Sequence, residues 1–316
     1  MSEIREQYLV GYRSSALLSI ITVNWNAGHQ LLDCINSIQK FGAPYVTQTI
    51  VVDNGSTDGS EKTIQDMLGV KVILSGENLG FGKACNLGAQ HAESEYLLFL
   101  NPDAALYSDS LPNALAFMQD PANVKVGICG VQLLDESGRL SRSCARFPSA
   151  FGFMAHALGL DRLFPRLSPA MAEWDHAQTR EVDQVIGAFF LVRREVFDVL
   201  GGFDERFFVY FEEVDFSRRA HNAGWRSVYL ADAKAFHAGG GTSNQVKARR
   251  LFYSLRSRLL YSFKHFSIPA ASTVLFVTLL IEPLARSVLA LVRRSLPGFK
   301  ETWAGYFMLW TWQSVL

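Results

Sequence analysis

Short apolar runs alternate with helix-patterned segments over the first 105 residues. The runs are rich in β-branched and aliphatic residues and end in polar residues, which is typical of buried parallel strands. They cover residues 16–26, 48–53, 70–76 and 95–100. Apolar residues at helical spacing fill the segments between them, at 29–42, 61–69 and 80–92. This alternation predicts βαβ units, right-handed crossovers and an α/β fold whose mostly parallel central sheet is flanked by helices.

The pattern changes after residue 140. Residues 141–180 are irregular and contain Pro148, Pro165 and Pro169, so we expect a loop or lid there. A strand followed by a helix resumes at 182–208, a further strand leads into a Gly-rich loop, and the remainder is largely helical. The chain is therefore predicted to divide into a sheet domain, 1–244, with halves 17–105 and 106–244, and a helical extension, 245–316.

Composition narrows the class of protein only slightly. The formal net charge is zero, which gives no reason to expect a nucleic-acid partner. The four cysteines are far apart and form no CxxC pair, so they are expected to be buried thiols in a reducing cytosol. The first residues carry two early glutamates and lack a long apolar run, which argues against a secretory signal.

Each of the four early strands ends in hydrogen-bonding groups. They are Asn24 and Asn26, Asp53 and Asn54, Asn78 and Gly80, and Asn101 and Asp103. Ligands of open α/β sheets bind beyond the carboxyl ends of the strands, so this edge is the expected binding site. Turn formation is the alternative for any one residue, but four such ends in succession favour a site. A dinucleotide fingerprint is excluded because the glycines at 80, 82 and 88 have the wrong spacing and follow the third strand.

Several segments, taken in order, resemble the family 2 glycosyltransferases with a GT-A fold, and most closely their bacterial rhamnosyltransferase-type members. The segments are SIITVNWN, IVVDNGSTDGS, ENLGFGKACNLGA, FLNPDA, GAFFLVRREVFDVLGGFDERFFVYFEEVDFSRRAHNAGW and HAGGGTS. They span residues 17–243. The resemblance implies a GT-A (nucleotide-diphospho-sugar transferase) fold with a nucleotide-binding half at 17–105, an acceptor-side half at 106–244 and a helical C-terminal extension.

The resemblance also implies that the strand ends hold the nucleotide of a dTDP- or UDP-sugar. Asp53 would accept the N3–H of uracil or thymine, which a carboxylate does more strongly than an amide oxygen. Asn24 and nearby backbone would hold the base and ribose. The other implied nucleotide-binding residues are Thr22, Asn54, Asn78, Gly82, Asn86 and Asn101.

A metal site is implied by the NPD segment, which stands where the family commonly has D-x-D. Asp103 would ligate Mn²⁺ or Mg²⁺ bridging the diphosphate, since hard oxygen ligands suit these ions. Asn101 replaces the first Asp of the triplet and leaves a less anionic site. In several family members a histidine at the place of His237 is a further metal ligand; the alternative is a loop histidine that touches only phosphate.

Three carboxylates, Glu212, Glu213 and Asp215, lie inside an aromatic run where relatives have E-D-x-D. Burial and a neighbouring carboxylate raise a carboxyl pKa, so the cluster can supply the base that deprotonates the acceptor hydroxyl. Glu213 matches the usual Asp and is the expected base, with Glu212 as the alternative. Asp215 can orient the site or pair with Arg218 or Arg219. A solvated helix start, where acids complement the dipole, is the competing interpretation.

The region after Gln245 is both basic and apolar. Up to Lys300 it holds ten Lys or Arg against one acid, Glu282. Its longest charge-free stretch has 16 residues, fewer than the roughly 20 that a membrane span needs, and Pro269 and Pro283 are expected to break it. The arginines and the final aromatic run favour peripheral contact with an anionic cytoplasmic leaflet. Packing on the catalytic domain or in a dimer is the alternative.

These features predict an inverting, metal-dependent glycosyltransferase. It would move one rhamnose from dTDP-rhamnose to a glycan or polyprenyl-diphosphate-linked acceptor for cell-surface polysaccharide, at the cytoplasmic face of the inner membrane. A single base with direct attack implies inversion, and the missing Q-x-x-R-W motif implies one sugar per encounter. A UDP-hexose donor and a catalytically silent nucleotide-sugar-binding scaffold are the alternatives, and oligomerisation is left open.

Overall fold

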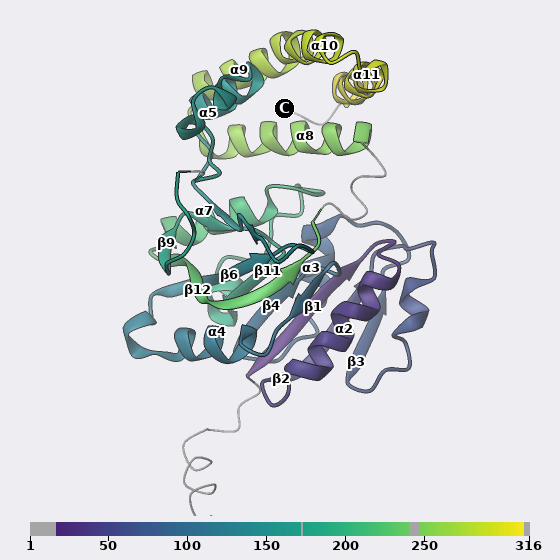
Figure 1. The fold of residues 1–316 in the computed structure, drawn as a ribbon, viewed down its shortest axis with the longest axis vertical. Coiled ribbons are helices and arrows are strands. Elements are labelled where there is room, and N and C mark those ends of the chain that lie inside the picture. The colour runs from purple at the N-terminus through teal and green to yellow at the C-terminus, as the bar shows by residue number, and fades with distance from the viewer. Residues whose placement is uncertain (1–16, 172, 240–246, 313–316) are drawn as a thin grey trace, which may run out of the picture.

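The computed structural model describes residues 17–171, 173–239 and 247–312, and shows a sheet domain topped by a layer of helices (Figure 1). The main strands are β1 (Leu18–Asn24), β2 (Val46–Asp53), β3 (Val70–Leu74), β4 (Tyr96–Leu100), β5 (Ala104–Leu106), β6 (Val126–Leu134), β11 (Phe189–Arg193) and β12 (Arg226–His237). Shorter strands are β7 (Leu140–Ser141), β8 (Cys144–Ala145), β9 (Arg180–Val182) and β10 (Gln184–Val185). The predictions for residues 1–16, for the Gly-rich loop beyond Gly239 and for the boundary at 244 lie outside the described residues.

Helices connect and cover these strands. In the sheet domain they are α2 (His29–Phe41), α3 (Phe81–Ala89), α4 (Ser110–Gln119), α5 (Ala150–Ala157), α6 (Arg194–Val199) and α7 (Glu212–Asn222). The C-terminal layer consists of α8 (Lys247–His265), α9 (Ile268–Phe276), the π-helical turn η6 (Val277–Ile281), α10 (Glu282–Val292) and α11 (Leu296–Thr311). Among the described residues, short 3₁₀ turns form at η1 (Ser60–Thr63), η2 (Pro121–Asn123), η3 (Leu160–Arg162) and η4 (Pro165–Leu167).

The central sheet runs in the order β3-β2-β1-β4-β11-β6-β12-β5. Neighbours are parallel from β3 to β4 and between β6 and β12, whereas β11 and β5 run antiparallel to their neighbours. The predicted α/β fold with a mostly parallel sheet is confirmed. Because β1, β2 and β4 are parallel, their carboxyl ends lie at one edge.

Both faces of the sheet are buried, as the unbroken apolar strands predict. Successive side chains point to opposite faces of a strand, so Ile20 packs in the cluster with α2 and α4, whereas Ile21 packs in the cluster with α3, α6 and α7. All four cysteines are buried and free, as expected from their spacing.

The helix predicted at 61–69 is wrong. Only the 3₁₀ turn η1 forms there, followed by turns. Local side chains compete with helix formation: the Ser60 hydroxyl and N–H both donate to Asp58, and the Thr63 hydroxyl donates to the Ser60 carbonyl.

The region 141–180 is more ordered than a loop prediction suggests. It contains β7, β8, α5 and two 3₁₀ turns. Phe153 of α5 packs on Phe211 before α7 and on Tyr261 of α8, with ring centroids 5.8 and 6.3 Å apart. The segment therefore joins the sheet domain to the C-terminal layer.

The prolines do not break the C-terminal apolar segment, contrary to expectation. Pro269 lies in the first turn of α9, where a missing N–H costs nothing. Pro283 follows the π-helical turn, which absorbs the lost backbone hydrogen bond. The resulting helical run Ile268–Val292 contains an 18-residue stretch with a mean hydropathy of 2.0 and, by length and composition alone, is long enough and apolar enough to cross a membrane.

Candidate active site

The ends of β1 and β2 form the first part of the site. Asn24 lies opposite Asp53 in the parallel register, and its Nδ2 donates to Asp53 Oδ1 over 2.8 Å. The same amide donates to Ser60 Oγ, and the other Asp53 oxygen accepts from the Ser56 N–H. Asn24 Oδ1 is buried and has no hydrogen-bond partner among the described residues. A buried acceptor without a partner calls for an explanation, and a bound ligand's donor would satisfy it.

Asn54 and Asn78 shape the neighbouring loops. Asn54 Nδ2 donates to Asn78 Oδ1 over 3.1 Å, and Asn54 Oδ1 accepts from the Leu79 N–H over 2.8 Å. Asn78 Oδ1 also accepts from the Gly80 N–H. These amides are committed mainly to holding the loop after β2 against the loop after β3.

Gly80 lets the acidic segment approach this edge. Its φ is +86°, and a Cβ there would lie 2.4 Å from the backbone oxygen of Phe208. The next residue, Phe81, donates its N–H to that same oxygen over 2.6 Å. Only glycine allows this close contact between the start of α3 and the segment before α7.

Three predicted nucleotide contacts have other surroundings. Asn86 bonds to both the N–H and the carbonyl of Phe203, at 2.9 Å each. Gly82 lies where α3 meets α7, since a Cβ there would be 3.4 Å from Glu212 Cβ. Thr22 is fully buried within β1. In this structure these residues build the frame around the site.

The NPD turn brings Asp103 to His237. β5 pairs with the end of β12, so His237 lies opposite Ala104, and His237 Nε2 is 3.4 Å from Asp103 Oδ1. The Ala104 N–H donates to the Asn101 carbonyl over 3.0 Å, which tightens the turn. Both members of the Asp103–His237 pair are partly exposed, at 12% and 13%.

This pair fits a divalent ion that takes most of its ligands from substrate. Among the described residues no group of three or more His, Cys, Asp or Glu gathers to hold a metal. Mg²⁺ is commonly bound by one or two carboxylates together with phosphate oxygens and water, and oxygen ligands also suit Mn²⁺ better than imidazole does. Asp103 therefore fits as the carboxylate ligand where a diphosphate supplies further oxygens, and His237 is the weaker ligand of the pair.

Glu212 and Glu213 are adjacent acids in the first turn of α7, where Glu212 is buried and Glu213 is partly exposed. Glu212 is 5% exposed, and one carboxylate oxygen of each residue is buried without a hydrogen-bond partner among the described residues. Burial raises the pKa of Glu212 well above its usual range, and the charge of Glu213 raises it further. Burial also raises the pKa of Glu213. The burial of Glu212 argues against the competing interpretation of a solvated helix start.

The backbone before this pair is strained. Tyr210 and Phe211 have φ values of +68° and +70°, in the left-handed region that aromatic residues rarely adopt. The Ser257 hydroxyl of α8 holds the Val209 carbonyl over 2.9 Å just before them. Strain of this kind persists where the surroundings enforce it, and it is concentrated at functional sites.

Phe81 connects the acid pair to the NPD turn. A Cβ on Gly187 would contact the Phe81 ring at 3.7 Å. The carbonyl of Ala188, the residue after Gly187, accepts a hydrogen bond from the Asn101 N–H over 3.1 Å. Contacts through Phe81 and residues 187–188 therefore link the segment before α7 to the NPD turn after β4.

Asp215 is committed to an ion network that fastens α7 to α8. It is fully buried and receives Lys264 Nζ at 2.6 Å, His265 Nε2 at 2.7 Å and Arg219 Nε at 2.8 Å. The expected pairing with Arg219 is confirmed. Burial alone would raise the pKa of Asp215, but the hydrogen bonds from His265 and Lys264 and the charge of Arg219 lower it. The residue is placed to position the helix rather than to react.

Replacing Asp215 with asparagine is expected to cost about 3 kcal/mol of unfolding free energy at pH 7, because Lys264, Arg219 and His265 lose their buried carboxylate partner. Since the folded-state pKa is lowered, this stabilisation is present above the usual value of 3.8 and is lost as pH falls through the folded value. Urea unfolding of both proteins from pH 7 downward measures the difference.

The matched control is Asp198→Asn, which removes an exposed i,i+4 pair with Arg194. It should cost less than about 0.5 kcal/mol. Equal destabilisation by the two variants would contradict the assignment of Asp215.

Sequence patterns missed several of these contacts. Ser56 and Ser60 hold the Asn24–Asp53 pair, and only the STDGS string pointed to them. Lys264 and His265 contact Asp215 although they lie about 50 residues further along the chain. No local pattern signals such a contact.

Solved nucleotide-sugar transferases share this arrangement of the chain. The mannosyltransferase PcManGT from Pyrobaculum calidifontis, in complex with GDP-Man and Mn²⁺, matches with a TM-score of 0.57 and 17% identity, over 98% of this chain and 94% of that one. S. aureus TarS 1–349 in complex with UDP-GlcNAc matches with a TM-score of 0.53 and 18% identity, over 93% and 81%. The fold is that of the GT-A glycosyltransferases.

The sequence comparison narrows this class. The chain belongs to glycosyl transferase family 2, whose family model matches residues 19–201. It is 28% identical over 262 residues to the N-acetylglucosaminyl-diphospho-decaprenol L-rhamnosyltransferase of Mycobacterium tuberculosis H37Rv, covering 78% of this chain and 83% of that one. It is 27% identical over 221 residues to rhamnosyltransferase WbbL of Escherichia coli K12, covering 67% and 80%. The predicted resemblance and enzyme class are confirmed: the protein is a glycosyltransferase similar to bacterial rhamnosyltransferases.

Proposed function

We propose that the protein transfers a single rhamnose from dTDP-rhamnose to a lipid-linked glycan acceptor, with inversion and with the help of Mn²⁺ or Mg²⁺, in cell-surface polysaccharide synthesis. The observation that carries the proposal is the Glu212–Glu213 pair, which packs at the start of α3 beside the sheet edge that holds the Asn24–Asp53 and Asp103–His237 pairs. Donor binding and proton removal both need such groups at one edge.

The nucleotide lies at the ends of β1 and β2 in this proposal. Asp53 accepts the N3–H of the pyrimidine, and the unpartnered Asn24 Oδ1 accepts a second hydrogen bond from the base or ribose. The bonds from Ser56 and Ser60 hold both side chains in place before the donor arrives. Preorganised groups lose little conformational entropy on binding.

Asp103 and His237 hold the ion against the diphosphate in this proposal. When bound, the ion offsets the negative charge that develops on the leaving nucleoside diphosphate. Their partial exposure leaves room for the phosphate oxygens that complete the ligand set.

Glu213 accepts the proton of the acceptor hydroxyl as that oxygen attacks the anomeric carbon. It is less buried than Glu212, so an acceptor can reach it. Its raised pKa makes it a stronger base than an ordinary glutamate. With one base and direct attack, the anomeric configuration inverts.

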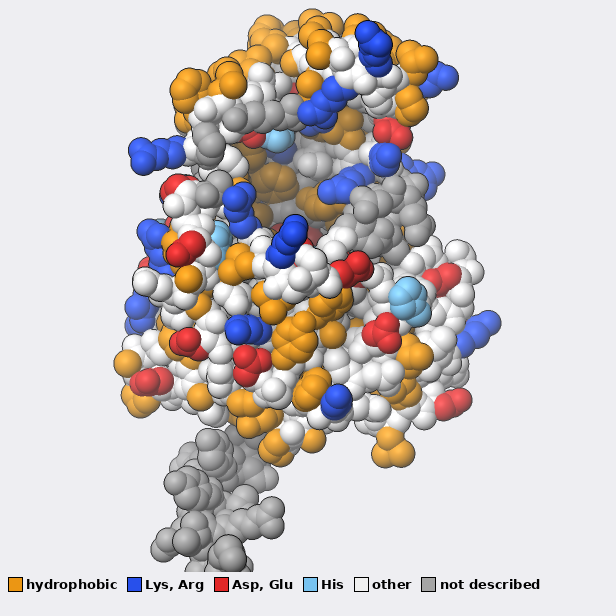
Figure 2. Space-filling model, in the orientation of Figure 1, with side chains coloured by type: hydrophobic (Ala, Val, Ile, Leu, Met, Phe, Trp, Pro, Cys, Tyr) orange, Lys and Arg blue, Asp and Glu red, His pale blue; other side chains and the backbone are white. Residues whose placement is uncertain are grey.

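The relatives support the sugar and the acceptor class. The mycobacterial relative is an N-acetylglucosaminyl-diphospho-decaprenol L-rhamnosyltransferase, and the E. coli relative is also a rhamnosyltransferase. A lipid carrier suits the C-terminal layer of this chain. Figure 2 shows hydrophobic side chains covering the outer surface of that layer, with Lys and Arg beside them.

We place this surface against the cytoplasmic face of a membrane. Exposed apolar residues of the layer include Phe276, Leu280, Leu284, Val288, Leu291 and Trp310. The inner face of α10 instead carries Glu282, which is buried in ion pairs with Arg258 and Arg286. A helix with an apolar outer face and charged groups on its inner face suits peripheral contact with a membrane rather than a membrane-spanning position.

Incubation with dTDP-rhamnose, Mn²⁺ and synthetic N-acetylglucosaminyl-diphospho-farnesol tests the proposal. We expect a product heavier by one deoxyhexose, detected by mass spectrometry, with an anomeric configuration opposite to the donor's by NMR. EDTA should abolish transfer, and UDP-glucose should react poorly.

Transfer from UDP-hexoses alone would overturn the donor assignment. Mn²⁺-dependent donor binding without transfer or hydrolysis of any donor would instead indicate a silent scaffold and overturn the enzymatic proposal.

A further inference from the structure

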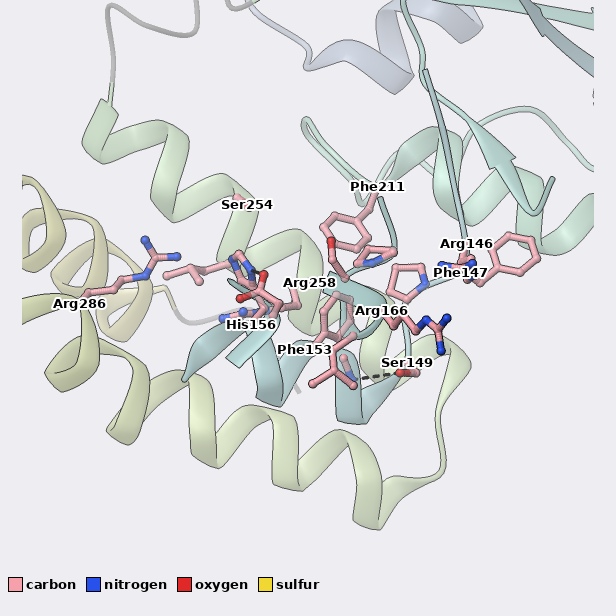
Figure 3. Close-up of a pocket in the computed structure, with 17 residues that line it drawn as sticks. Arg146, Phe147, Ser149, Phe153, His156, Arg166, Phe211, Ser254, Arg258 and Arg286 are labelled. Carbon is pink, nitrogen blue, oxygen red and sulfur yellow. Dashed lines mark hydrogen bonds and ion pairs between the residues drawn. The ribbon is translucent and has the colours of Figure 1, made fainter. Parts of the chain in front are cut away.

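A cavity of about 360 Å³ lies between the sheet domain and the C-terminal layer, apart from the residues of the nucleotide edge. Its walls come from the segment after β8, from α5, from the turn η4, and from α8 and α10. Four arginines line it: Arg146, Arg166, Arg258 and Arg286. In the view of Figure 3, Arg258 and Arg286 lie on one side and Arg146 and Arg166 on the other, with aromatic rings between them.

The arginines of α8 and α10 keep a net positive charge. Glu282 accepts from both Arg258 and Arg286, so one carboxylate faces two guanidinium groups. Arg258 is 5% exposed, and its Nε–H is buried without a hydrogen-bond partner among the described residues. A buried guanidinium N–H without an acceptor is costly, so an anion that accepted this hydrogen bond would be favoured in the cavity.

The opposite wall adds cations that are easier to reach. Arg146 pairs with Glu173, and both side chains are about a third or more exposed, at 42% and 33%. Arg166 is exposed, and no ion pair between described residues involves it. His156 and Asp161 also line the cavity and bond to each other over 2.7 Å. A ligand with negative charge on two adjacent groups can therefore meet arginines from both walls.

The position of the cavity relates it to the acid pair. Phe211 lines the cavity and immediately precedes Glu212 and Glu213. Arg286 belongs to α10, whose opposite side carries exposed residues such as Leu284 and Val288. The cavity thus lies between the proposed catalytic base and the apolar surface proposed to contact the membrane.

We propose that this arginine-lined cavity binds the diphosphate of a polyisoprenoid-linked acceptor. The lipid chain leaves toward the apolar surface of α9 and α10, and the sugar at the other end of the diphosphate reaches past Phe211 to Glu213. The cavity volume lies within the roughly 300–1,000 Å³ range of small-ligand sites. The inference rests on the proposed function for the sugar's destination, while the anion site stands on the cavity itself.

Binding of farnesyl diphosphate to the full-length protein, measured by calorimetry, tests the site. Farnesyl phosphate and farnesol serve as probes with fewer or no phosphates. We expect farnesyl diphosphate to bind most tightly and the substitution Arg166→Gln to weaken it about tenfold or more, as expected for a lost charged hydrogen bond. Arg146→Gln should weaken it similarly, whereas farnesol binding should not change.

The matched control is Arg226→Gln, which removes an exposed guanidinium at the start of β12, the opposite end of that strand from His237. It should leave farnesyl diphosphate binding unchanged. Equal affinity of farnesyl diphosphate for the wild type, Arg166→Gln and Arg146→Gln proteins would overturn the proposal. So would loss of binding to phosphatidylglycerol vesicles in these two variants with farnesyl diphosphate binding intact, because that result indicates a site for membrane headgroups.

Binding of dTDP with Mn²⁺ is measured on the same proteins and should be equal in all of them. If dTDP fails to bind the wild type, the proposed function is wrong. The proposal of a diphosphate site in the cavity is then still decided by the binding of farnesyl diphosphate, farnesyl phosphate and farnesol. If dTDP binds and farnesyl diphosphate does not, only the inference about the cavity is wrong.

Discussion

Replacing Glu213 with glutamine is expected to lower kcat for rhamnosyl transfer by about 10²- to 10⁴-fold, the usual contribution of a general base. Glutamine keeps the shape of the side chain but cannot take a proton from the acceptor hydroxyl. Initial rates with saturating dTDP-rhamnose and acceptor measure the effect. Donor affinity should change little, because Glu213 is assigned to the acceptor side.

The pH dependence separates a base from a merely structural acid. Burial raises the pKa of Glu213 above its usual 4.5, so the acidic limb of the rate profile should lie above that value in the wild type. The limb should disappear in Glu213→Gln. Glu212→Gln tests the alternative base: if it lowers kcat more than Glu213→Gln, the two assignments must be exchanged.

Stability should move in the opposite direction to activity. A carboxyl group with a raised folded-state pKa binds a proton that the unfolded chain releases, so its contribution to stability falls as pH rises above the unfolded value. Glutamine does not ionise, so its substitution removes this loss of stability at neutral pH. We therefore expect Glu213→Gln to melt at the same temperature as the wild type or higher at pH 7. Glu195→Gln, an exposed glutamate on α6, is the matched control and should change neither quantity.

Replacing Asp103 with asparagine is expected to lower the rate at a fixed Mn²⁺ concentration by about 100-fold or more. The change removes the only carboxylate of the Asp103–His237 pair, and with it most of the charge that attracts a divalent ion. An asparagine oxygen is still a ligand. Raising the Mn²⁺ concentration should therefore restore part of the activity.

Binding measurements separate this effect from a loss of fold. Stabilisation of the wild type by dTDP should increase when Mn²⁺ is added, and this increase should vanish in Asp103→Asn. The exposed Asp66→Asn is the matched control and should behave as the wild type does. A rate that is unchanged in Asp103→Asn, or insensitive to EDTA in the wild type, would rule out the metal assignment.

The sequence predicted the features that repeat along the chain or stand next to one another. Apolar runs located β1, β2, β3 and β4 and placed Asn24 and Asp53 at the same edge, because parallel strands put their carboxyl ends together. The adjacency of Glu212 and Glu213 within an aromatic run also needed no tertiary information, although only the structure shows that Glu212 is the more buried of the two. The resemblance of the ordered motifs to family 2 glycosyltransferases then matched the family found by comparison.

Local patterns were less reliable where short-range competition or packing decides the outcome. Side-chain hydrogen bonds of Ser60 and Thr63 prevented the predicted helix after β2. A π-helical turn carried the C-terminal helix past Pro283, although proline usually ends a helix. The expected loop at 141–180 holds α5, which is ordered by its packing against α8 and α9.

What the sequence by itself determined was the sheet, the edge at which its parallel strands end and the adjacent acids at 212 and 213, because periodicity and adjacency are properties of the chain. The tertiary structure alone decided that Asp215 is held by Lys264 and His265, that Asn86 fastens the Phe203 loop, and that the arginines of four separate segments line one cavity. Such contacts join residues tens of positions apart. The packing of the helices determines which of these residues meet, and no local sequence pattern predicts that packing.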